Sequence, residues 1–307
     1  MQCVARLSLT AMLQLPARSV SRLLARYGQA LYDNGYARYW YTLAVLAVAD
    51  EDRSLRRELS AAWEVDWAWK SLTPAHSHIP MPLELLLALV SLALLWKWSG
   101  IATLLLLGFT GALRRGEIQP LSPQHVLLPQ MLGVYSESFF MIRIFNPKMR
   151  RLAARMEHAR VEEPGLLGWL SAVLEVWPAS APFFAGSPHQ LTAALQALLA
   201  FFHVPSVDGL GITWASLRPG RATQLYMAGE PLQKIQWLCR WAASRTMDIY
   251  VQEVASLSVL RHVPPVARER VRLFAAAAEP LLLREAAALR SHRSPAVRSR
   301  SVPPRLA

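Results

Sequence analysis

Hydrophobic residues recur every three or four positions between Ser19 and Trp69, which is the spacing of helices with one buried face. An Asp-Asn-Gly turn at 33–35 separates two of these stripes. A third helix is expected at 55–69, where tryptophans lie close together. The pattern therefore predicts a small helical bundle in the N-terminal part of the chain.

Two strongly apolar segments follow, the first from Leu85 to Trp96 and the second from Ile101 onward. Ser99 and Gly100 lie between them and predict a break in the helix. A membrane-spanning helix needs about 20 unbroken apolar residues, and each segment is shorter than that. We therefore expect two buried helices. The alternative is that these segments belong to a membrane-associated helical protein.

The rest of the chain predicts more helices and one β-hairpin. Apolar and aromatic residues at 139–145 indicate a strand, and a returning strand is expected at 158–161, after a turn at Asn146 and Pro147. The fold class is therefore mainly α with a small β-hairpin or sheet (α+β). Helical spacing predicts further helices at 166–176, 191–202, 218–227, 232–238 and 246–255.

Composition divides the chain into four parts. Residues 1–73 are expected to form a helical domain, and the proline-rich segment 74–82 has the character of a linker. Residues 83–260 form the main domain. The last part, 261–307, is a basic tail rich in alanine, arginine and proline, expected to form one helix up to Arg290 and then to be disordered.

The net charge of the chain indicates which class of molecule it binds. The chain of 307 residues carries 33 Lys and Arg against 21 Asp and Glu, a formal net charge of +12. Such a surplus favours a polyanion, because each cation that neutralises a phosphate releases counterions. The two cysteines, Cys3 and Cys239, cannot build a disulfide framework or a metal-binding pair. With no zinc spacing and no glycine-rich phosphate loop, the sequence predicts no cofactor, no metal and no small-molecule substrate.

Three short blocks contain residue types that handle phosphate. The first is 114–117, the second runs from Ser216 to Thr223, and the third from Leu238 to Tyr250. Each block alone has a structural explanation, since an arginine can cap a helix and a tyrosine can be a core aromatic. Their order and spacing, taken together, indicate a function.

The first two blocks resemble motifs of the tyrosine recombinase and phage integrase family. The family's first motif reads T-G-x-R-x-G-E, and 110–117 is similar to it with one extra residue, which makes Arg114 the motif's arginine. The second motif, H-x-L-R-x-x-x-A-T, is matched at Leu217, Arg218, Ala222 and Thr223.

The third block and a hairpin lysine complete the resemblance. The family's last motif ends in a tyrosine nine positions after a His or Trp, as Tyr250 follows Trp241. Lys148 stands where the family has a lysine on a β-hairpin. The resemblance covers about 82–255, and the helical N-terminal part is similar to the family's core-binding domain.

The resemblance implies a domain that binds double-stranded DNA and cuts and rejoins it. Arg114 and Arg218 would hold the phosphate oxygens and stabilise the charge that develops on them. Tyr250 would attack the phosphorus and form a phosphotyrosyl link. Lys148 would protonate the leaving 5′ oxygen, and Trp241 would hydrogen-bond a phosphate oxygen or pack against the site.

One position departs from the family pattern. The family's histidine, three before the second arginine, is Ala215, and alanine can neither donate a hydrogen bond nor relay a proton. Losing one such group commonly costs about 10²–10³ in rate, unless a neighbour such as Arg221 or Trp214 compensates. A decayed or domesticated protein that binds DNA without cleaving it is therefore the second hypothesis. A type IB topoisomerase, with related chemistry, is another.

The resemblance also suggests a setting for the protein. Such recombinases act as homo-oligomers on paired DNA sites and belong to mobile elements or descend from them. The expected compartment is the nucleus in a eukaryote and the cytoplasm otherwise. An organelle is the alternative, because residues 1–32 are basic, rich in serine and free of acidic residues until the turn, as transit peptides are.

Overall fold

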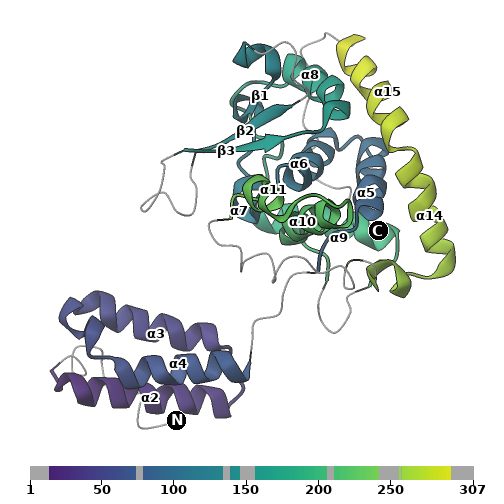
Figure 1. Cartoon of the computed structure of the whole chain (residues 1–307). Coiled ribbons are helices and arrows are strands. Elements are labelled where there is room, and N and C mark those ends of the chain that lie inside the picture. Colours follow the sequence, from purple (N-terminus) through teal and green to yellow (C-terminus); the bar gives the residue numbers. More distant parts are fainter. Residues whose placement is uncertain are drawn as a thin grey trace. The chain divides into compact units, whose positions relative to one another are not determined.

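The computed structural model describes residues 14–73, 79–133, 139–145, 156–205, 211–241, 256 and 258–291. The chain divides into two compact units, Met1–His76 and Ser77–Ala307. Helices dominate both units in Figure 1, and the second also holds a three-stranded antiparallel sheet. This arrangement confirms the α+β class with a small sheet.

In its described part, the first unit is a bundle of three α-helices that pack on one another in every pairing. Its core is filled by the apolar stripes seen in the sequence, with Val20, Tyr41 and Leu59 fully buried. The Tyr41 hydroxyl donates to the Ala62 carbonyl at 2.8 Å, which satisfies its polar end inside the core. The helices are α2 (Ala17–Asp33), α3 (Arg38–Glu51) and α4 (Ser60–Leu72).

The helix expected at 55–69 is two elements. A short 3-10 helix, η1 (Arg53–Arg57), comes first and is capped by the Asp52 carboxylate, which accepts from the Ser54 N–H at 2.9 Å. Leu59 then leaves the helical conformation with ψ of 34° before α4 begins. Its side chain is fully buried, so core packing accompanies a break that periodicity alone did not show.

Two buried helices form the centre of the second unit. In α5 (Leu83–Leu95) and α6 (Ser99–Thr110) most side chains are buried, and the two helices pack on each other. Among the described residues, no helix has both the length and the apolar character needed to cross a membrane. By their burial, the apolar residues of both helices belong to the core of the second unit.

The sheet lies beside this helical core. Its order is β1-β2-β3, with all neighbours antiparallel, and the predicted hairpin corresponds to β2 and β3. Buried Phe140, Ile142 and Ile144 alternate along β2 and give the sheet its apolar face. The strands are β1 (Val126–Leu127), which the sequence pattern did not predict, β2 (Phe140–Ile144) and β3 (Glu157–Val161).

Further helices of the second unit lie around α5 and α6 (Figure 1). They are α7 (Arg115–Ile118), η2 (Pro123–His125), η3 (Pro129–Leu132), η4 (Pro164–Leu166), α8 (Leu167–Val176), α9 (Pro188–Phe201), η5 (Trp214–Ser216), α10 (Leu217–Met227), α11 (Leu232–Leu238), η6 (Leu260–His262), α14 (Pro265–Ala276) and α15 (Ala278–Ser291). The helix predicted at 246–255 lies outside the described residues.

The segment expected as a tail contributes to the core. Instead of one helix up to Arg290 it forms two, α14 and α15, which pack on α5 and α8. Val271 and Leu282 are buried there, and the Ser91 hydroxyl donates to the Phe274 carbonyl at 2.6 Å. Its abundant alanines and arginines indicated a solvated tail, but the apolar positions among them face the core.

Helix ends in this chain carry left-handed residues that are not glycine. Lys97, Ala112, His203 and Arg240 have φ between 45° and 61°. Each donates its backbone N–H to the carbonyl of the residue three positions earlier. The residue that follows it donates to the carbonyl five positions before its own. Together these two hydrogen bonds form a Schellman motif. Glycine is the usual residue at that position, so these ends carried no signal in the sequence.

The break between α5 and α6 illustrates the consequence. It lies at 96–98, around left-handed Lys97, and the expected break residues Ser99 and Gly100 instead begin α6. Gly100 serves close packing, because a Cβ at this position would lie 1.9 Å from the Phe183 carbonyl oxygen. The glycine therefore marks a tight contact rather than a turn.

Gly220 has a similar role in α10, the helix that carries Arg218. A Cβ there would lie 2.4 Å from the Met81 carbonyl oxygen and 2.9 Å from the Met81 nitrogen. The Met81 N–H donates to the Ser216 carbonyl at 2.9 Å, which fixes that backbone against the helix. Pro219 stands in the first turn of α10, where its missing N–H costs nothing.

We predict that Gly220→Ala lowers the free energy of unfolding by about 1–3 kcal/mol, because the added methyl group overpacks a backbone contact. Gly168→Ala in α8 is the matched control, since its Cβ would enter open space; it should be neutral or slightly stabilising. Urea unfolding of both variants measures this difference. Equal stability of the two variants would contradict the close approach of Met81.

Candidate active site

Arg218 lies in the first turn of α10 with only 4% of its surface exposed. Its Nη1 donates to the Ala112 carbonyl at 3.1 Å, and its Nη2 donates to the Cys239 carbonyl. In the part of the chain that the structure describes, no carboxylate forms an ion pair with it. Burying a guanidinium whose described hydrogen-bond partners are carbonyls is an expensive arrangement.

The two carbonyls belong to helix C-termini. Ala112 follows the C-cap of α6, and Cys239 is the C-cap of α11. The carbonyls at such ends carry partial negative charge, which favours a nearby cation. Two helix ends therefore stabilise the charge on Arg218 without neutralising it.

Arg114 is the N-cap residue of α7 and is more exposed than Arg218. Its backbone N–H donates to Glu117 Oε2 at 2.8 Å, and its Nη1 donates to Glu117 Oε1 at 2.8 Å. Glu157, at the start of β3, lies 3.7 Å from the same Nη1. Arg114 is thus held at the site by one close carboxylate and approached by a second.

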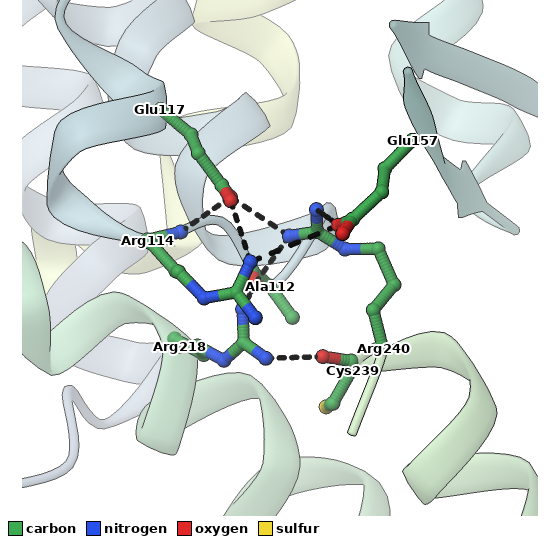
Figure 2. Close-up of polar contacts among 7 residues, drawn as sticks. All are labelled: Ala112, Arg114, Glu117, Glu157, Arg218, Cys239 and Arg240. Carbon is green, nitrogen blue, oxygen red and sulfur yellow. Dashed lines mark hydrogen bonds and ion pairs between the residues drawn. The ribbon is translucent and has the colours of Figure 1, made fainter. Parts of the chain in front are cut away.

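Arg240 is a third guanidinium of the site, and the sequence motifs did not single it out (Figure 2). Its Nη2 donates to Glu117 Oε2 at 2.9 Å and to the Ala112 carbonyl at 3.3 Å, and its Nη1 donates to Glu157 Oε2 at 3.2 Å. Arg114 and Arg240 therefore share both carboxylates. Among the residues that the structure describes, three guanidiniums against two carboxylates leave the cluster with one positive charge.

These charges shift the titration of their neighbours. Burial, with repulsion from Arg114 and Arg240, lowers the pKa of Arg218 from its ordinary value to about 10, so it remains protonated at neutral pH. Burial alone would raise the pKa of Glu117, but the attraction of Arg240 and its hydrogen bonds outweigh burial and the net pKa is lowered. Burial raises the pKa of the Cys239 thiol to about 11, which keeps it neutral.

The structure places three of the predicted site residues together. Trp241 is buried next to Arg218, whose Cζ lies 5.7 Å from the centroid of its ring. Arg114 and Arg218 are joined through Ala112, Arg240 and Glu117, as Figure 2 shows. The predicted nucleophile Tyr250 and the predicted general acid Lys148 lie outside the described residues.

The position of the missing histidine is occupied by Ala215 in η5. Its N–H donates to the Thr213 hydroxyl at 3.2 Å. The two neighbours that could have compensated are engaged elsewhere: the Trp214 indole donates to the Leu191 carbonyl at 2.8 Å, and Arg221 pairs with Glu163 at 2.7 Å. Arg240, next to Trp241 in the third block, is the extra cation that the structure brings to the site.

Across the described ranges, no group of three or more His, Cys, Asp or Glu side chains could hold a metal ion. Both carboxylates of the cluster are already paired with arginines. The arrangement is instead suited to an anion that could approach Arg114 and Arg218.

Comparisons with known proteins give a structural likeness but no family. No protein-family model matches the chain, and no curated protein matches it. Among solved structures, the chain is similar to "Crystal structure of XerA recombinase", at 14% sequence identity and a TM-score of 0.43, over 83% of this chain and 90% of that chain. A likeness at this level carries no argument about activity, so the function rests on this chain's own residues.

We predict that Glu117→Gln lowers the free energy of unfolding by about 3 kcal/mol at pH 7, because a buried carboxylate that pairs with two arginines is lost. The folded-state pKa of Glu117 is lowered, so its contribution is present above pH 4.5 and is lost as pH falls through that lower pKa.

Unfolding of the wild type and the variant between pH 7 and acid measures this dependence. The stability difference should shrink below pH 4.5. Glu269→Gln on α14, where the side chain is 61% exposed, is the control and should change little. A difference that stays constant at all pH values would show that the Glu117 charge has no part in stability.

Proposed function

We propose that this chain binds double-stranded DNA and cuts and rejoins it through a phosphotyrosyl intermediate at Tyr250, as a tyrosine recombinase does. The single observation that carries the proposal is the buried Arg218 guanidinium, which lies beside Arg114 without a carboxylate of its own among the described residues. The spacing of these arginines from Trp241 and Tyr250 supports it.

A phosphodiester fits the charge of this site. Its two non-bridging oxygens can each accept charge-assisted hydrogen bonds, and a guanidinium offers two parallel N–H donors to such a group. Arg218 and Arg114 together supply more donors than the carbonyls and carboxylates around them use. A bound phosphate would also neutralise the positive charge that the cluster retains.

The reaction follows from these groups. The Tyr250 oxygen attacks phosphorus and forms a P–O bond, while the bond from phosphorus to the 5′ oxygen breaks. Lys148 gives a proton to that leaving oxygen, and the tyrosine proton passes to solvent, because Ala215 has no group to take it. Arg114 and Arg218 stabilise the additional negative charge of the transition state. Rejoining is the reverse, with a 5′ hydroxyl as nucleophile.

The second candidate is a protein that binds DNA without cleaving it. Ala215 favours it. Trp214 and Arg221 bind other partners among the described residues, so neither replaces the family's histidine. Both candidates use the same cationic cluster and differ only in the chemistry at Tyr250. Trapping of a covalent adduct therefore separates them.

The remaining features of the proposal follow from the family resemblance. The protein would act as a homo-oligomer on paired DNA sites and would derive from a mobile element. Its place of action would be the nucleus of a eukaryote or, if the basic N-terminal segment is a transit peptide, an organelle. In a prokaryote it would be the cytoplasm.

We predict a covalent protein–DNA adduct when the full chain is incubated with nicked duplexes from the DNA that flanks its coding sequence. The nick lets the cleaved end diffuse away, so the adduct accumulates. Tyr250→Phe should abolish the shifted band on a denaturing gel, because the phenyl ring lacks the attacking oxygen. Tyr226→Phe, which changes an exposed tyrosine on α10, is the matched control and should retain it.

The possible outcomes divide the candidates cleanly. An adduct that depends on Tyr250 supports the recombinase. An adduct that persists in Tyr250→Phe assigns the nucleophile elsewhere. A folded protein that binds DNA and forms no adduct supports the binding protein that has lost cleavage.

A further inference from the structure

Arg240 connects three parts of the second unit through one side chain. It follows the end of α11, and its guanidinium reaches Glu117 in α7, Glu157 in β3 and the Ala112 carbonyl after α6. Figure 2 shows this guanidinium next to both carboxylates, with Arg114 at the same Glu117. The side chain is only 10% exposed, so these contacts form away from bulk solvent.

Two features of Arg240 are costly. Its backbone is left-handed, with φ of 54°, at a helix end where glycine would be unstrained. Its Nε is buried with no hydrogen-bond partner among the described residues, which adds a desolvation penalty. An arginine that costs this much for folding persists only where its surroundings hold it, and here the two ion pairs do so.

Removing the Arg240 charge would change what Arg114 faces. Glu117 and Glu157 lie 2.8 Å and 3.7 Å from Arg114 Nη1. Without Arg240, those two carboxylates would have Arg114 as their nearest guanidinium, and the cluster would become neutral. A neutral cluster attracts a phosphate less. An Arg114 that pairs with two carboxylates also has fewer N–H donors left for a phosphate.

We propose that Arg240 is a positioning residue: it pairs with Glu117 and Glu157 so that Arg114 and Arg218 remain available to a DNA phosphate. This inference rests on the proposed function and deepens it. Arg240 itself does not contact the phosphate. Its effect on binding is therefore electrostatic and passes through the two carboxylates.

The test is a charge-rescue experiment on the full chain, read as affinity for a fluorescent DNA duplex. Arg240→Gly removes the guanidinium, and its relief of the left-handed backbone offsets part of the stability lost with the two ion pairs. We expect affinity to fall about tenfold, comparable to the loss when an outer-shell partner of a metal ligand is removed. Adding Glu157→Gln restores the positive charge of the cluster and should recover most of that loss.

Glu269→Gln in the Arg240→Gly background is the matched control. It makes the same change in net charge at an exposed position on α14 and should recover little. If Arg240→Gly does not fold, Arg240→Gln replaces it, with the same loss of charge. Circular dichroism and the unfolding temperature establish which variant is used.

Each outcome decides the proposal. Loss of affinity with rescue by Glu157→Gln supports positioning. Unchanged affinity in the Arg240 variant overturns it, as does a loss that Glu157→Gln does not recover, which would make Arg240 a direct phosphate contact or a merely structural residue. A wild-type chain that binds no DNA refutes the proposed function, and this inference with it, before any variant is measured.

Discussion

The burial of the Arg218 guanidinium is the constraint on which the rest of the site depends. A charge placed inside a folded unit must be stabilised there. Among the described residues, Arg218 donates to carbonyls at the C-termini of α6 and α11, and no carboxylate forms an ion pair with it. Both helices end in left-handed residues, Ala112 and Arg240. The same two turns present their carbonyls to Arg218 and bring the Arg240 side chain to Glu117. Local backbone geometry and site electrostatics are thus one arrangement.

Much of the fold was readable from hydrophobic spacing, because long apolar stripes predict buried helix faces. The helices around Arg218, the β2–β3 hairpin and the α+β class follow from it. Helix ends did not follow, since Lys97 and His203 adopt the left-handed turn that glycine usually marks. Gly100, which suggested a break, instead permits close contact with Phe183. The prediction of a tail after residue 260 was wrong, because alanine and arginine separate the apolar residues that face the core.

The site was readable only as far as motif spacing reached. Order along the chain drew attention to Arg114, Arg218 and Trp241, and the structure places them together. It did not reveal that Glu157 lies near Arg114 or that Arg240 pairs with the same carboxylates. Such pairs join residues far apart in sequence, so no local pattern encodes them. Tyr250 and Lys148 keep the roles that the resemblance implies, as predictions.

The salt dependence of DNA affinity decides whether this cluster is a site for DNA phosphate. Binding of a duplex would be measured between about 50 and 200 mM salt for the wild type and for a folded Arg218→Gln variant. For a phosphate site, we expect a steep fall of affinity with salt in the wild type and a slope shallower by about one in the variant. A wild-type affinity that does not change with salt, or an Arg218→Gln slope equal to that of the wild type, would overturn the assignment of the cluster as a phosphate site.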